Sequence, residues 1–159
     1  MSKIANIVKE DAHIIWKNFS GKPDNFNPQG GKRLYNLVLS ADEAEQLADE
    51  GWNVKSRASK DDPNDILYYL PCRVAYGNRP PKIYLVTKKN KTLLDEDTVG
   101  TLDYAEIEKV DMVVTPYEWT MGAKSGITAY TKTMYVTIAE DEFSDKYGEY
   151  DDDNEIAFG

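Results

Sequence analysis

The stretch VDMVVTPYEWTMGAKSGITAYTKTMYVTI, residues 110–138, is the most informative part of the chain for its fold. It contains two runs rich in β-branched and aromatic residues, 110–119 and 127–138, which is the composition of β-strands. The segment between them, TMGAKSG, contains two glycines and suits a hairpin turn. The stretch therefore predicts a long antiparallel hairpin.

The chain before this hairpin continues the strand pattern. Further strand-like runs cover 13–20, 33–40, 66–76 and 82–88, and the first two bracket a loop at 21–32 that is rich in Gly and Pro. Alternation in the run 66–76 predicts one inward face and leaves Arg73 on the opposite, polar face. The residues expected on the inward face are Ile66, Tyr68, Leu70, Cys72, Val74 and Tyr76.

One α-helix is predicted at about 41–50. Ser40 and Glu43 have the spacing of a capping box, and Gly51 suits the position after the last helical residue. A shorter helical turn is expected within 95–107. Five or more strands with one clear helix predict a mainly β protein, a small barrel with helical decoration.

Negative charge is concentrated at the C-terminal end. Of 28 acidic and 19 basic residues, nine acidic and one basic residue follow position 138, so residues 1–138 carry 19 acids and 18 bases. A terminal block of like charge repels itself and commonly serves as a disordered interaction arm. We therefore predict a folded domain at 1–138 and a disordered acidic tail at 139–159. The tail residues expected to contact a partner are Asp151, Asp152, Asp153, Ile156 and Phe158.

The composition argues against several kinds of chemistry. Cys72 is the only cysteine and His13 the only histidine, so a disulfide within the chain and a classical zinc site are excluded. Phosphate-binding glycine motifs and the GxSxG motif are absent. We expect no enzyme activity, no cofactor and no metal. With no apolar segment typical of a signal peptide or a membrane span, the predicted location is the cytoplasm, that of the host cell if a phage encodes the chain.

Aromatic and basic residues alternate through the body of the chain, which is the pairing that single-stranded nucleic acid requires. Bases stack on aromatic rings, and Lys and Arg neutralise phosphates. The candidate contacts are Trp16, Lys17, Phe19, Lys22, Phe26, Lys32, Arg33, Tyr35, Arg73, Arg79, Lys82, Tyr84, Lys88, Tyr117, Trp119 and Lys124. Aromatic residues on strands more often belong to the core, and Trp52, directly after the helix, is expected there. For Phe26, ligand contact and loop anchoring remain equal alternatives.

Several short stretches carry a resemblance to a known family. NFSGKPDNFNPQGGKR, GWNVK, LDYAEIEKVDMVV and AYTKTMYVTI are similar to tailed-bacteriophage single-stranded DNA-binding proteins, and DDDNEIAFG resembles the acidic tip of bacterial proteins of the same function. The resemblance implies an OB-type barrel, five-stranded or elaborated. Ala157 and the final Gly159 depart from the bacterial tip, which ends in Ile-Pro-Phe. The helix follows the second predicted strand, whereas a standard OB barrel carries it after the third.

Together these features predict a sequence-independent single-stranded DNA-binding protein of the phage type. Its tail would gate the DNA-binding groove and recruit replication or recombination proteins of the phage or host. Two alternatives stay open: an acidic DNA mimic that inhibits a nucleic-acid enzyme, and a structural or adaptor β-barrel of a phage. Assembly into a homo-oligomer is also left open.

Overall fold

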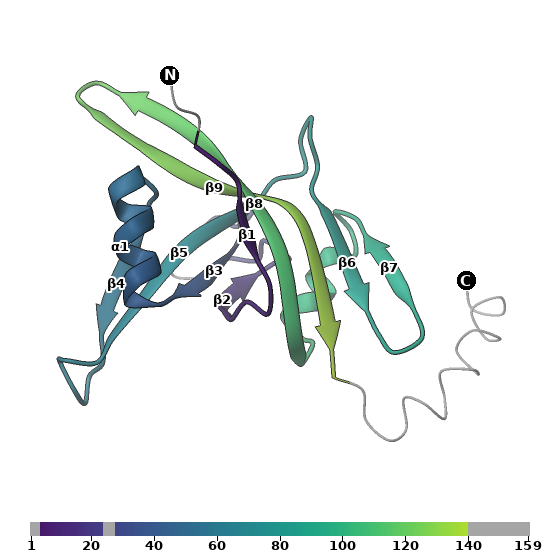
Figure 1. The fold of residues 1–159 in the computed structure, drawn as a ribbon. Helices are drawn as coiled ribbons and strands as arrows, with labels where there is room; N and C mark the ends of the chain where they lie inside the picture. The colour runs from purple at the N-terminus through teal and green to yellow at the C-terminus, as the bar shows by residue number, and fades with distance from the viewer. Residues whose placement is uncertain (1–3, 24–27, 140–159) are drawn as a thin grey trace, which may run out of the picture.

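A computed structural model describes residues 4–23 and 28–139 of the chain, so Phe26 and almost all of the predicted acidic tail lie outside the described residues. The described residues form one curled β-sheet of nine strands with one α-helix and one short 3-10 helix (Figure 1). The elements in chain order are β1 (Ile7–Lys9), β2 (Ile14–Asn18), β3 (Arg33–Leu39), α1 (Ala41–Glu50), β4 (Lys55–Ala58), β5 (Ile66–Val74), β6 (Lys82–Val86), β7 (Lys91–Leu94), η1 (Val99–Asp103), β8 (Ile107–Met121) and β9 (Lys124–Ile138).

The last strand, β9, pairs with three other strands, β5, β6 and β8. The main strand order is β1-β8-β9-β5-β3-β2, with β4 added to β5, β6 to β9 and β7 to β6. The neighbours pair antiparallel, except that β9 runs parallel to β5 and to β6. The mainly β, OB-like architecture is confirmed in its elaborated form. The long β8–β9 hairpin, predicted from residues 110–138, crosses the molecule and extends past α1 (Figure 1).

Helix α1 occupies the predicted residues and has the predicted caps. The Ser40 hydroxyl accepts from the Glu43 N–H at 3.2 Å, and the Glu43 carboxylate accepts from the Ser40 N–H at 3.0 Å. Gly51 ends the helix with φ of +105°, a conformation that glycine adopts without strain. Ala44 and Leu47 pack on the core, and Trp52 is buried as predicted.

The sheet has two chemically different faces. On the first, which we call the inner face, strand residues such as Leu37, Leu70, Ala129 and Val136 are fully buried. The opposite face, which we call the open face, carries alternate residues of the same strands. Its members include Tyr69 and Arg73 on β5, Tyr130 and Tyr135 on β9, and Tyr117 on β8. The alternation predicted for 66–76 agrees with this arrangement at its centre, whereas Ile66 at its start is exposed.

Two elements refine the expected order of the fold. β1 was not predicted, and with it α1 follows the third strand of the chain rather than the second. The helical turn expected within 95–107 is η1, whose Asp103 carboxylate accepts the N–H groups of Phe19 and Ser20 at 2.6 and 3.0 Å. Neither helix in the described part of the chain is long and apolar enough to cross a membrane.

Candidate nucleic-acid interface

A groove with a volume of about 850 Å³ lies where the open faces of β8 and β9 meet the segment before β6. Its described lining includes three cationic side chains, Arg79, Lys82 and Lys132, and no carboxylate. Tyr117 and Tyr130 form its aromatic part, with ring centroids 5.8 Å apart at 75°. Tyr117 is 57% exposed, so its ring is available to a ligand. We call this site the central groove.

Strand register extends the central groove toward β5. Arg73 is paired with Tyr130 across the parallel β5–β9 contact, so both side chains lie on the open face. Arg73 is exposed. A fourth cation therefore lies next to the tyrosine pair. Lys132 lies at a β-bulge of β9, because Val114 pairs with Thr131 and Val113 with Thr133, which leaves Lys132 without a partner across the strands.

A second aromatic cluster lies toward the β2 edge of the sheet. The Trp16 indole is 49% exposed and meets Tyr69 edge to face, with centroids 5.0 Å apart at 89°. The Arg57 guanidinium lies 5.8 Å from the indole. Trp16 has φ of +49°, which is strained for a bulky side chain, and β2 changes register against β3 between Ile15 and Asn18. An exposed aromatic ring held by a strained backbone is the kind of feature that marks a functional position.

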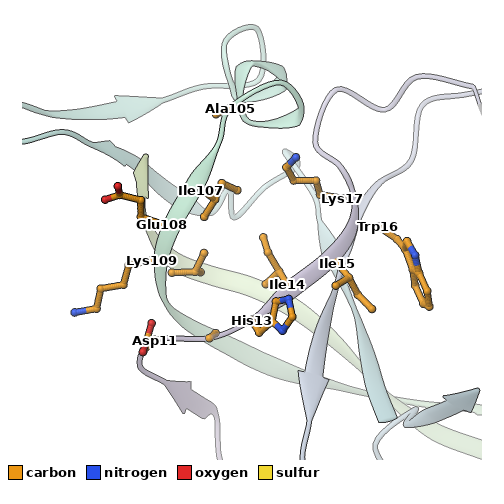
Figure 2. A pocket seen from close by; sticks show the side chains of 12 residues that line it. Asp11, His13, Ile14, Ile15, Trp16, Lys17, Ala105, Ile107, Glu108 and Lys109 are labelled. Atoms are coloured by element: carbon orange, nitrogen blue, oxygen red, sulfur yellow. The ribbon is translucent and has the colours of Figure 1, made fainter. Parts of the chain in front are cut away.

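Another pocket, of about 520 Å³, lies between β2 and the start of β8 and suits a polyanion less well. Its lining mixes charges, with Asp11 and Glu108 against Lys17 and Lys109 (Figure 2). Two carboxylates in a small pocket repel phosphate, whereas the central groove presents only cations. We therefore take the central groove, and not this pocket, as the candidate interface.

The structure brings part of the predicted contact set together. Tyr117, Arg79 and Lys82 line the central groove, Arg73 adjoins it, and Trp119 follows Tyr117 on the same face of β8. The Trp119 ring lies so close over Gly126 that a Cβ there would come within 2.7 Å of it. Lys124 lies exposed at the tip of the β8–β9 hairpin, away from the groove.

Two of the predicted aromatic contacts are instead in the core. Phe19 and Tyr35 have no exposed surface, and their rings stack with centroids 5.4 Å apart. The Tyr35 hydroxyl is satisfied by the Thr131 hydroxyl at 2.8 Å, and burial raises the pKa of Tyr35 well above its usual value. The expectation that these rings contact DNA is corrected, because both are fully buried and inaccessible to a base.

Some predicted cations already have partners within the protein. The Lys17 ammonium donates to the Asp103 carbonyl oxygen at 3.1 Å. Arg33 lies 3.6 Å from the Glu96 carboxylate and 5.5 Å from the Tyr76 ring centroid. Lys22 lies 5.1 Å from the Tyr104 ring centroid. These three side chains stabilise the base of the β2–β3 loop and its surroundings. Lys32 is exposed at the end of this loop, outside the central groove.

The remaining predicted contacts, Tyr84 and Lys88, lie on the β6–β7 hairpin and its turn. Tyr84 stacks on Tyr135 with centroids 4.9 Å apart and planes 9° from parallel. Lys88 is exposed in the turn.

Sequence reasoning missed several open-face residues. Tyr69 shares the parity of Arg73 on β5, so the alternation that singled out Arg73 could have identified it. Tyr130 and Tyr135 both face the open side of β9 although five positions separate them, which requires the bulge at Lys132. No local pattern in the sequence indicates that bulge.

A family model described as "Putative phage ssDNA-binding domain" matches residues 1–157. No curated protein sequence matches the chain significantly.

Among solved structures, the chain is similar to the single-stranded DNA-binding protein from bacteriophage Enc34 in complex with ssDNA. The TM-score is 0.54 at 13% sequence identity, over 87% of this chain and 89% of that one. A C-terminal truncation of the same phage protein gives a TM-score of 0.53 at 12% identity, over 86% of this chain and 87% of that one. At this identity the likeness shows a common fold.

Proposed function

The chain belongs to the phage ssDNA-binding domain family, and on that premise we propose that it binds single-stranded DNA without sequence preference along the open face of its sheet. The family is one of DNA-binding domains, and the chain is not an enzyme. The observation that carries the proposal is the central groove, in which two tyrosines meet three cations and no carboxylate among the described lining residues.

The chemistry of the open face supports binding that ignores base identity. A base can stack on the exposed face of Tyr117 or Trp16, and every base has a π-face, so stacking does not distinguish them. The phosphates between stacked bases would contact Arg73, Arg79, Lys82 and Lys132. These cations recognise the backbone, which is the same for every sequence.

We also propose a division into a DNA-binding body, residues 1–138, and an acidic tail from residue 139 onward. The tail carries nine carboxylates against Lys146, and as a tethered polyanion it would compete with DNA for the cations of the central groove. Once DNA displaces it, Asp151, Asp152, Asp153, Ile156 and Phe158 would contact a replication or recombination protein of the phage or host. The charge distribution of the sequence supports this part of the proposal.

The groove is tested with a charge-matched pair of variants. The first, Arg79→Gln with Lys132→Gln, removes two groove cations, and the control, Lys60→Gln with Lys124→Gln, removes two exposed cations outside the groove. Titration of labelled oligo-dT at low salt, followed by anisotropy, should show roughly tenfold weaker binding for the groove variant and little change for the control. Equal losses in both variants would place the binding site elsewhere, and no binding by the unmodified chain would refute the function.

The tail is tested by comparing the full chain with residues 1–138 in the same titration. Removal of the tail should strengthen binding, most clearly at low salt, because competition between the tail and DNA for the same cations disappears. Unchanged affinity at every salt concentration would contradict the gating role. A synthetic peptide of residues 139–159 that weakens DNA binding in trans would support it.

A further inference from the structure

A stacked aromatic pair lies on the open face beyond the central groove. Tyr84 on β6 and Tyr135 on β9 are register partners with ring centroids 4.9 Å apart, and Tyr135 is 37% exposed. The Lys91 ammonium from β7 lies 5.0 Å from the Tyr84 centroid and 5.5 Å from the Tyr135 centroid. Leu93, the β7 partner of Tyr84, is 55% exposed. We call Tyr84, Tyr135 and Lys91 the hairpin platform.

The β6–β7 hairpin, which carries this platform, contains basic residues and no acidic ones, although the protein as a whole is acidic. Residues 82–94 contain four cationic side chains and no acid, whereas the whole chain has a net charge of −9. The nearest acid by register, Asp111 opposite Tyr135, is already engaged by the Asp11 N–H at 2.8 Å and by Lys109 at 3.8 Å. The platform therefore combines exposed aromatic and apolar surface with net positive charge.

The strands connect the platform directly to the central groove. Lys82, which lines the groove, pairs with Thr133, and the next residues on this face are Tyr84 and Tyr135. From Tyr130 to Tyr135 the strand advances five residues, about 16 Å at about 3.3 Å per residue. A DNA strand that leaves the groove past Lys82 along β9 would meet the platform next.

Resting on the proposed function, we propose that the hairpin platform is a second single-stranded DNA contact, engaged only by strands long enough to extend beyond the central groove. A base packs against the exposed part of the Tyr135 ring. The flanking phosphates are neutralised by Lys91 of the platform and by Lys89, which is exposed in the turn between β6 and β7. The protein thus has two contacts in series, and its affinity rises with DNA length until both are occupied.

The test uses the full chain and oligo-dT of increasing length, from about 4 to about 30 nucleotides. One variant, Lys89→Gln with Lys91→Gln, removes the platform charge and that of the adjacent turn without changing strand residues that face the core. A second, Tyr84→Thr with Tyr135→Thr, removes the rings and keeps good strand formers. The control is Lys60→Gln with Lys124→Gln, which changes the net charge equally at two exposed positions outside the groove and the platform.

We expect both platform variants to bind the shortest oligonucleotides as the unmodified chain does and to lose about tenfold in affinity for the longest. For the charge variant, the slope of log K against log salt concentration should be less steep by about 1.4. Each lost phosphate contact accounts for about 0.7, and the variant loses two. A 5-iododeoxyuridine oligonucleotide should crosslink to Tyr84 or Tyr135 only when it is long.

The outcomes separate this inference from the function it rests on. Platform variants that match the control at every length would overturn the second contact while leaving the groove intact. Equal losses at short and long lengths would also overturn it, because the platform would then belong to the primary site. Absence of binding by the unmodified chain at all lengths would instead refute the proposed function itself.

Discussion

Trp16 combines a strained backbone with an exposed ring, and the two properties can be separated by substitution. Glycine tolerates the φ of +49°, whereas alanine at that angle costs about 1 kcal/mol. Trp16→Gly and Trp16→Ala should both weaken binding to oligo-dT, by about 1–3 kcal/mol for one lost stacking contact. Urea unfolding should show Trp16→Ala to be the less stable of the two by about 1 kcal/mol.

The Tyr69 ring, which contacts Trp16 edge to face, offers a check on this interpretation. If Trp16→Gly binds oligo-dT as tightly as the unmodified chain, Trp16 does not stack on a base, and the strain would have to serve the packing against Tyr69 instead.

Tyr35 tests the distinction between core and contact residues. Tyr35→Phe removes a hydroxyl bonded to Thr131 at 2.8 Å and leaves the buried Thr131 hydroxyl without that partner. The free energy of unfolding should fall by about 1–2 kcal/mol, while the affinity of the folded protein for oligo-dT should stay within about twofold. Chemical denaturation and a DNA titration on the same preparation measure both. A large loss of affinity with unchanged stability would instead indicate that Tyr35 contacts DNA.

At the scale of elements, the caps of α1 should contribute measurably to stability. Ser40→Ala removes the hydroxyl that accepts from the Glu43 N–H, and we expect a loss of about 1 kcal/mol in urea unfolding. Ser40→Asp, which keeps a capping oxygen, should restore most of it. If both variants unfold like the unmodified chain, the packing of α1 alone holds this helix.

Glu43, at the same end of α1, should make the free energy of unfolding depend on pH. The hydrogen bond from Lys9, and next the bond from the Ser40 N–H, lower the pKa of Glu43 below its usual value. A depressed folded-state pKa contributes stability above the unfolded pKa, and that contribution is lost as pH falls through the folded pKa. The stability difference between the unmodified chain and Glu43→Gln should therefore shrink on acidification. A difference that grows on acidification would contradict the assigned direction.

Local signals in the sequence were sufficient for most elements. The caps of α1, the glycine-containing turn of the β8–β9 hairpin and the alternation of β5 each depend on residues close in the chain, and each appears in the structure. The three-residue strand β1 was missed because its signal is too short, and its pairing with β8 joins residues about a hundred positions apart. The parallel pairs of β9 were missed for the same reason, since no local pattern encodes a distant neighbour.

The candidate site was less predictable than the fold. Residue type identified Trp16, Tyr117 and Arg79, but the same criterion also selected Phe19 and Tyr35, which are in the core. An aromatic residue on a strand has the same composition signal on either face, so only the register decides between them. The bulge at Lys132 changes that register within a single strand.

At the scale of the whole molecule, the four cations around the central groove set the expected response to salt. If Arg73, Arg79, Lys82 and Lys132 each neutralise one phosphate, the slope of log K against log salt concentration should be about −2.8 for DNA confined to the groove. Titrations of a short oligo-dT at several salt concentrations measure it. Arg79→Gln should reduce the magnitude by about 0.7, whereas a slope near zero would show that cations contribute little to binding.

The position of β9 at the end of the sheet-forming sequence also affects how the protein folds during synthesis. Its partners β5, β6 and β8 all precede it in the chain, so a nascent polypeptide that stops before Lys124 exposes the edges of all three. The pairings of β9 with β5 and β6 close long loops, whose entropy is lost before the contacts form. The sheet can therefore be completed only late, when nearly the whole body has been synthesised. Substitutions in β9 should alter the rate of folding, and losses to aggregation during synthesis, more than similar substitutions in β1 or β4 at the sheet margins.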